Sequence, residues 1–128
     1  MDGLIVKQPW ASLIIEGKKT MEVRGCRTKK QNEDFVIIES GMNRIIGDVR
    51  IFGCIELDKE TFESTRDKHL INLSYDEALI SFGYKSLYGW CLGEAREAAE
   101  PVICHNRKKG QVIWVKDAFP DDMYYRIK

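Results

Sequence analysis

The sequence lacks the features that mark membrane, zinc-binding and secreted proteins. No hydrophobic run reaches the roughly 18 residues that a membrane-spanning helix needs. Its four cysteines include no Cys-x-x-Cys pair, and its two histidines, His69 and His105, do not stand at a zinc-finger spacing. The N-terminus has no basic segment followed by an apolar one. We therefore expect free thiols in a reducing, cytoplasmic setting, with no metal, no cofactor and no membrane partner.

Net charge is also missing, because 20 Lys and Arg balance 20 Asp and Glu. The charges are unevenly placed. Residues 1–30 carry seven basic against three acidic side chains, giving +4, and residues 101–128 carry six against three, giving +3. The segment between them carries seven against fourteen, giving −7. If the two ends meet in space they form a basic face suited to nucleic acids; otherwise the charges are scattered over separate surfaces.

The length of 128 residues and the hydrophobic fraction of 44% suit one domain with its own core. No internal repeat or low-complexity segment divides the chain. We assign residues 1–128 to a single domain whose last part, 116–128, is a C-terminal tail.

The most specified stretch begins with a short helix. Pro9 suits a first helical turn, because its φ is fixed and it has no N–H to leave unpaired. Trp10, Leu13 and Ile14 then fall at i, i+3 and i+4, which predicts one apolar helical face. Gly17 can adopt a positive φ and end the helix.

A charged strand follows this helix over residues 20–24. Alternation places Glu22 and Arg24 on one face together with Thr20, whereas Lys19 and Met21 are expected on the other. Opposite charges two residues apart are common on a solvated strand, so the pattern alone is also compatible with a plain surface ion pair.

Strands predominate in the rest of the chain. Ser74 with Glu77 forms a capping box that opens a helix ended by Gly83, and a loop with a short helix is expected over 59–70. Gly47 and Gly53 fall where a barrel strand needs a bulge. Apolar runs of strand length occur at 4–7, 35–39, 45–58, 87–92, 101–104 and 111–115.

This order of elements predicts an α+β, mostly β fold. Many short strands with glycines at the corners favour a small closed or half-closed β-barrel with short helices at its openings. An open α+β sandwich is the alternative.

The sequence resembles the ASCH domain, a branch of the PUA-like barrels. The residues that carry the resemblance are Gln-Pro-Trp-Ala-Ser-Leu at 8–13 and the motif Gly-x-Lys-x-x-Glu-x-Arg at 17–24. Weaker matches extend it from about residue 4 to residue 115. The resemblance implies a PUA-like barrel with a cleft for RNA, nucleotides or modified nucleosides, and a role in transcription or translation regulation.

The resemblance places the ligand cleft at this motif. Lys19 and Arg24 would attract phosphate, and Glu22 would hold Arg24 or accept a hydrogen bond from a base. A tryptophan, Trp10 or Trp90, would stack on a base. The expected ligand-binding residues are Trp10, Ser12, Lys18, Lys19, Glu22, Arg24 and Ser40. A phosphate track outside the cleft would use Arg27, Lys29, Lys30, Arg107, Lys108 and Lys109.

Two other functions stay open. Some small ASCH proteins resemble amidohydrolases that act on acylated cytidines, and ribonuclease activity has been proposed in the wider family. In such an enzyme Lys19 and Glu22 would be catalytic, but the hydrolase motif Lys-x-x-Thr has Glu22 where it needs its Thr. The acidic residues of the 58–77 segment could instead serve a protein-interaction module, with a protein as the partner.

Overall fold

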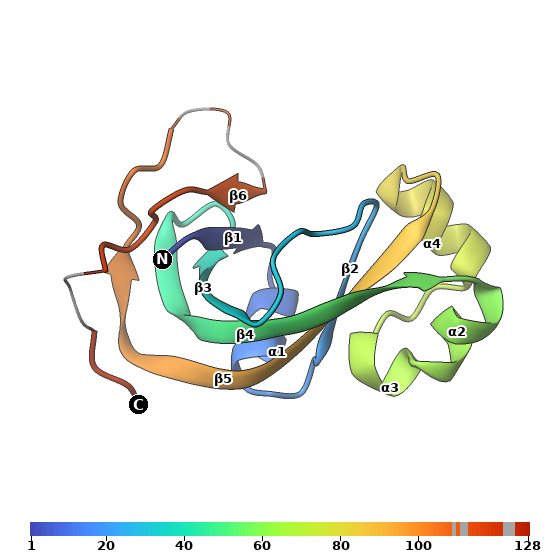
Figure 1. The fold of residues 1–128 in the computed structure, drawn as a ribbon, viewed down its shortest axis with the longest axis horizontal. Helices are drawn as coiled ribbons and strands as arrows, with labels where there is room; N and C mark the ends of the chain where they lie inside the picture. Colours follow the sequence, from blue (N-terminus) through green and yellow to red (C-terminus); the bar gives the residue numbers. More distant parts are fainter. Residues whose placement is uncertain (109, 111–112, 122–124) are drawn as a thin grey trace.

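In the described part of the chain, a six-stranded sheet carries four short helices (Figure 1). The computed structural model describes residues 1–108, 110, 113–121 and 125–128. The strands are β1 (Gly3–Val6), β2 (Met21–Arg24), β3 (Glu33–Glu39), β4 (Arg44–Leu57), β5 (Leu87–Ile103) and β6 (Trp114–Val115). The helices are α1 (Trp10–Ile15), α2 (Lys59–Ser64), α3 (Arg66–His69) and α4 (Tyr75–Phe82).

The sheet is organised around its two long strands. β4 and β5 pair antiparallel along their whole length, and the strand order is β2-β5-β4-β3-β1-β6. β3 is antiparallel to β4, β1 is parallel to β3, and β6 is antiparallel to β1. The helices α2, α3 and α4 gather at one end of β4 and β5, and both termini lie toward the other end (Figure 1).

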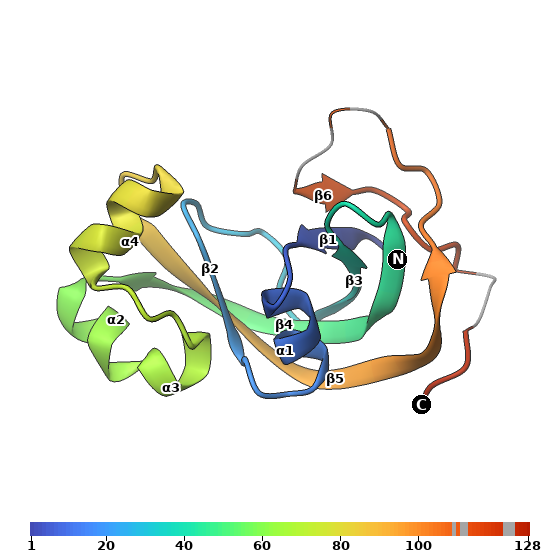
Figure 2. The same ribbon diagram turned by 180° about the vertical axis from the view of Figure 1, so that it is seen from behind.

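The predicted barrel is not closed. Among the described strands, β2 and β6 form the two edges of the sheet. β1 already pairs with β3 on one side and with β6 on the other, so it leaves no edge for a ladder with β2. The sheet curls until β2 and β1 stand on opposite sides of a gap, with α1 below it (Figure 2). The mostly β class with short helices is confirmed, whereas closure into a barrel is not.

Two segments differ from their predicted structure. The 87–104 region is one strand of 17 residues rather than two short ones. Its register with β4 shifts between the Ile45–Val102 pair and the Gly47–Glu97 pair. Pro101 lies between Glu97 and Val102, among residues of β5 that have no partner on β4. Since a bulged residue donates no ladder bond, the missing N–H of Pro101 costs nothing there. The 59–70 region forms two helices, and the 111–115 strand is seen as β6, with 111–112 outside the described residues.

The predicted helix ends are confirmed, but the packed face of α1 is shifted. The Ser74 side chain accepts from Glu77 N–H, the Glu77 carboxylate accepts from Ser74 N–H, and Gly83 ends α4 at φ 72°. In α1 the fully buried residues are Ala11, Ile14 and Ile15. Trp10 and Leu13 are only half-buried, and Trp10 borders a cavity.

Candidate ligand-binding site

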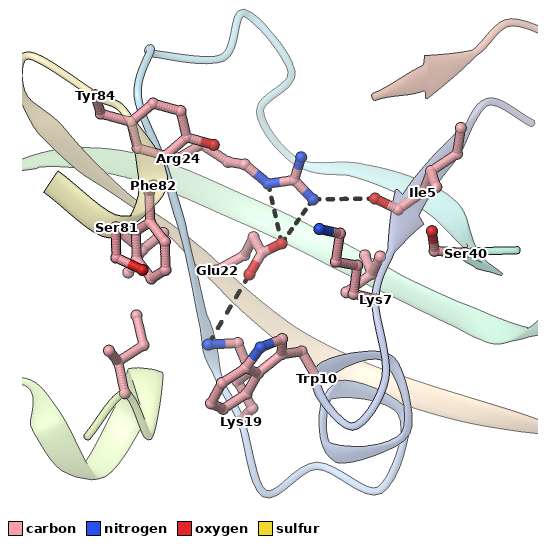
Figure 3. Close-up of a pocket in the computed structure, with 13 residues that line it drawn as sticks. Ile5, Lys7, Trp10, Lys19, Glu22, Arg24, Ser40, Ser81, Phe82 and Tyr84 are labelled. Carbon is pink, nitrogen blue, oxygen red and sulfur yellow. Dashed lines mark hydrogen bonds and ion pairs between the residues drawn. The ribbon is translucent and has the colours of Figure 1, made fainter. Parts of the chain in front are cut away.

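A cavity of about 340 Å³ occupies the gap between β2 and β1. Figure 3 shows Glu22 and Arg24 entering it from β2, Lys7 entering from the end of β1, and Trp10 rising from α1 below. We call it the Lys19 pocket. It is lined by Ile5, Val6, Lys7, Trp10, Lys19, Glu22, Val23, Arg24, Ser40, Ile71, Ser81, Phe82 and Tyr84.

Lys19 is the most buried cation of the pocket, with 2% of its surface exposed. Its Nζ donates to the carbonyl oxygen of His69, lies 3.9 Å from Glu22 Oε1 and sits 4.8 Å from the centroid of the Trp10 ring. Burial lowers the Lys19 pKa to about 8; Glu22 opposes this shift and Arg24 adds to it. A fraction of the amine is therefore neutral near neutral pH.

Glu22 and Arg24 form a tight pair on one face of β2, as strand alternation predicts. Glu22 Oε2 accepts from Arg24 Nε at 3.0 Å and from Nη2 at 2.7 Å. The same Nη2 donates to the carbonyl oxygen of Ile5 on β1 at 3.1 Å. Arg24 thus spans the gap that no ladder closes, and its guanidinium lies 5.8 Å from the centroid of the Trp90 ring.

The expected separation of Lys19 from Glu22 is wrong. Alternation assigned them to opposite faces, yet both side chains reach the Lys19 pocket. β2 begins only at Met21, so Lys19 lies in the turn before the strand and is not bound by its period of two.

Five of the seven expected ligand-binding residues line the pocket, and Ser12 and Lys18 do not. Ser12 borders a separate recess on the far side of α1, and its N–H donates to Gln8 Oε1 at 3.0 Å. Lys18 is exposed, with its Nζ 3.1 Å from Glu16 Oε2.

The wall that α4 supplies was not predicted from the sequence. Ser81, Phe82 and Tyr84 line the pocket from the C-terminal end of α4 and the turn after it. The one local signal is Gly25, directly after β2. A Cβ at that position would lie 2.3 Å from the Tyr84 ring, so only glycine lets Tyr84 pack against the end of β2. Lys7 was likewise missed, because it ends an apolar run that reads simply as a core strand.

A comparison with protein-family models identifies the family of this chain. A family model described as the ASCH domain matches residues 4–104, most of the sequence. The chain belongs to the ASCH family. ASCH domains have a PUA-like fold, which is a fold of RNA-binding families. A search of curated proteins found no match.

Solved ASCH structures share the fold at low sequence identity. A serine-to-alanine mutant of ZmASCH from Zymomonas mobilis aligns with a TM-score of 0.70 at 16% identity, over 88% of this chain and 84% of that one. ASCH from Zymomonas mobilis without that mutation aligns with a TM-score of 0.65 at 18% identity, over 80% and 72% of the two chains. At these identities the likeness concerns the fold alone.

The expected phosphate track of this ASCH domain falls into two places. Arg27, Lys29 and Lys30 border one recess together with Trp114. Arg107 and Lys108 border another, beside Gly41 and Asn43, and Lys109 lies outside the described residues.

Some of these basic side chains already have acidic partners. Lys30 Nζ donates to Asp2 Oδ2 at 2.7 Å, and Arg27 Nη2 lies 3.5 Å from Glu56 Oε2. The track therefore remains a prediction, and its two halves border different recesses of the ASCH domain.

The sequence suggested that Trp10 or Trp90 stacks on a base. Trp90 cannot do so. It is 1% exposed, its Nε1 donates to the carbonyl oxygen of Cys26, and its ring stacks on Trp114 with centroids 5.9 Å apart. Trp10, which is half-buried and lines the pocket, remains available.

His69 is a core residue of this ASCH domain. It is fully buried, accepts from Ile71 N–H through Nδ1 and contacts the carbonyl oxygen of Phe62 through Nε2 at 2.8 Å. Burial lowers its pKa, which keeps the ring neutral. Both ring nitrogens are engaged, so His69 has none left for a ligand.

Among the described residues, no group of His, Cys, Asp and Glu side chains is placed to hold a metal ion. No described helix is both long enough and apolar enough to cross a membrane.

Proposed function

We propose that this ASCH domain binds RNA or a nucleotide in the Lys19 pocket. The observation that carries the proposal is the charge of the pocket. Lys7, Lys19 and Arg24 line it against the single carboxylate of Glu22, giving +2 when all are ionised, in a protein whose total net charge is zero. Its volume of about 340 Å³ lies at the lower end of the range for small-molecule sites, which suits one nucleotide unit.

Lys7 is the best placed cation for a phosphate group. Its side chain is exposed and forms no ion pair with any residue that the structure describes. Figure 3 shows its amine pointing across the pocket toward Glu22 and Arg24. Arg24 and Lys19, by contrast, already donate to protein oxygens, so they shape the electrostatic field of the pocket more than they bind phosphate directly. The half-buried Trp10 ring supports stacking of a base beside them.

Lys7→Ala tests this proposal. We expect it to weaken binding of a single-stranded RNA octamer about fivefold and to lower the slope of log K against log salt by about 0.7, the value for one lost phosphate contact. Fluorescence anisotropy at several salt concentrations measures both quantities.

Lys18→Ala is the matched control, because Lys18 is, like Lys7, an exposed lysine but lies outside the pocket. It should leave the affinity and the salt slope unchanged. An equal loss in both variants, or none in Lys7→Ala, would contradict the assignment of the site.

A hydrolase is the second candidate, favoured by the lowered pKa of Lys19. A lysine with a pKa of about 8 has a neutral fraction at neutral pH that can act as a general base. Glu22 stands 3.9 Å away, at the place where the acylcytidine hydrolase motif has its Thr. Without a threonine hydroxyl as nucleophile, a water molecule would have to attack the substrate. Turnover of an acylated cytidine or of RNA that disappears in Lys19→Met would place catalysis above binding.

A further inference from the structure

The open edge of β2 borders the Lys19 pocket (Figure 3). In an antiparallel pair, alternate residues direct both backbone polar groups toward the partner, and the residues between them direct both away. Leu92 N–H donates to the Thr20 carbonyl oxygen at 2.9 Å, which fixes the phase of the ladder between β2 and β5. Glu22 and Arg24 therefore bond to β5, and the N–H and C=O of Val23 point to the open edge.

Val23 has little but its backbone to offer a ligand. Its side chain is buried in the apolar cluster with Phe62 and Leu87, under the helices at the end of the sheet. No hydrogen bond joins its N–H or C=O to the described residues beyond β5. Val23 nevertheless lines the pocket. A donor and an acceptor, both from one residue, are thus available beside Lys7 and Lys19.

We infer that the β2 edge at Val23 binds the Watson–Crick edge of a nucleobase, an inference that rests on the proposed nucleotide-binding function. Each of the RNA bases carries a hydrogen-bond donor next to an acceptor on this edge. In one extended residue the N–H and C=O point to the same side of the strand, so they can pair with such a neighbouring acceptor and donor. The ligand class is a nucleotide whose base is unpaired.

This inference separates single-stranded from double-stranded RNA. In a duplex the Watson–Crick edges are occupied, so they cannot reach Val23. Charge alone predicts the reverse preference, because a duplex carries more phosphates per unit length than a single strand. The β2 edge therefore predicts that the octamer binds about tenfold more tightly alone than annealed to its complement, the effect of one or two hydrogen bonds.

Val23→Pro tests the residue directly. Proline removes the outward N–H and is tolerated on an edge strand, since no ladder bond is lost there. Val23→Ala is the matched control, because it loses side-chain contacts but keeps the N–H. Each variant is titrated with the RNA octamer and with an abasic octamer that has the same sugar–phosphate backbone.

We expect Val23→Pro to weaken binding of the base-bearing octamer about fivefold relative to Val23→Ala, and both variants to bind the abasic octamer like the unmodified protein. Equal weakening on both probes, or none on the first, would overturn the role of Val23. If Val23→Pro fails to fold, the unmodified protein still decides, because equal affinity for the single-stranded and annealed octamers would overturn it too.

The outcomes distinguish this inference from the proposed function. If the protein binds the single-stranded and the annealed octamer equally well, and Lys7→Ala weakens that binding, the proposed phosphate-binding pocket stands and only the role of Val23 in base binding is overturned. If the protein binds neither the single-stranded nor the annealed octamer, the proposed function and the role of Val23 are both overturned.

Discussion

At Lys19 a buried amine touches a carbonyl oxygen, a carboxylate and an aromatic face, and its pKa falls to about 8. Desolvation is the largest cause of this shift, since the charged form loses water that Glu22 only partly replaces. The amine therefore changes its charge within the range where binding and activity are readily measured. Binding and catalysis would respond to that change with opposite signs.

RNA affinity should fall as pH rises through about 8, because the charged amine that attracts phosphate becomes neutral. Anisotropy titrations between about pH 6.5 and 9.5 measure this dependence, and Lys19→Met should flatten it. Hydrolysis with Lys19 as general base would instead accelerate over the same range. A rate that rises through pH 8 and is lost in Lys19→Met would contradict the binding function as the main one.

At the scale of elements, His69 joins α2 and α3 to the turn before β2. Its ring stacks on Phe62 of α2 with centroids 4.3 Å apart, its Nδ1 accepts from Ile71, and its carbonyl oxygen accepts from Lys19. Since Nδ1 is an acceptor, the proton of the neutral ring lies on Nε2, which donates to Phe62. A second proton would have to occupy Nδ1 and would break the bond from Ile71.

The free energy of unfolding should therefore decrease as pH falls below about 6.5, the ordinary value for histidine. Burial holds the folded pKa of His69 below that value, with Lys19 and Arg66 adding to the shift, so the unfolded chain takes up the proton first. The decrease cannot exceed about 1.4 kcal/mol per pH unit and ends at the folded pKa. Urea unfolding between about pH 5 and 7.5 measures it.

His69→Gln should remove most of this dependence, while His105→Gln, at the other and exposed histidine, should retain it. The same slope in both variants would assign the effect to other groups.

Elements with local signals were the predictable part of this fold. The capping box at Ser74, the glycines that follow α1 and α4, and the apolar runs of β3 and β4 all depend on neighbours in sequence. The length of β5 was not predictable, because its irregular register with β4 depends on distant partners: Gly47 pairs with Glu97, 50 residues later, and Ile45 with Val102, 57 residues later. The prediction of a closed barrel was wrong for the same reason: β6 pairs with the edge of β1 that would otherwise be available to β2.

The sequence motifs predicted part of the candidate site. Trp10, Lys19, Glu22, Arg24 and Ser40 meet in the pocket, although alternation misplaced Lys19. The missed residues come from elements that fold over the motif: the turn after β1, and α4 with the segment after it. No pattern within one segment reports such long-range approach.

At the scale of the whole molecule, the C-terminal tail is fastened to the middle of the sheet. Asp48 of β4 is buried and accepts two bonds from Arg96 of β5, at 2.9 and 2.8 Å, and a further bond from the Tyr125 hydroxyl. Burial and this bond to a carboxylate raise the Tyr125 pKa, so the hydroxyl remains a donor. Tyr125, which lies in the predicted tail, is thus bonded to the sheet.

Tyr125→Phe should lower the free energy of unfolding by about 1.5–3 kcal/mol, the effect of one lost hydrogen bond to a buried charge. Urea unfolding measures this change. Tyr88→Phe is the control, because no described residue bonds to the Tyr88 hydroxyl, and it should change stability by less than about 0.5 kcal/mol. Similar values for the two variants would show that Asp48 does not depend on Tyr125.

The pairing of β1 with β6 imposes an order on biosynthesis. Leu4 leaves the ribosome well before its partner Trp114, which follows it by 110 residues. The N-terminal amine must likewise wait for the carbonyl oxygen of Phe119. Until then a nascent chain that has already paired β1 with β3 presents the other side of β1 without a partner. An uncovered apolar edge of that kind is a site for aggregation, so the nascent domain is exposed to misassembly until β6 has been made.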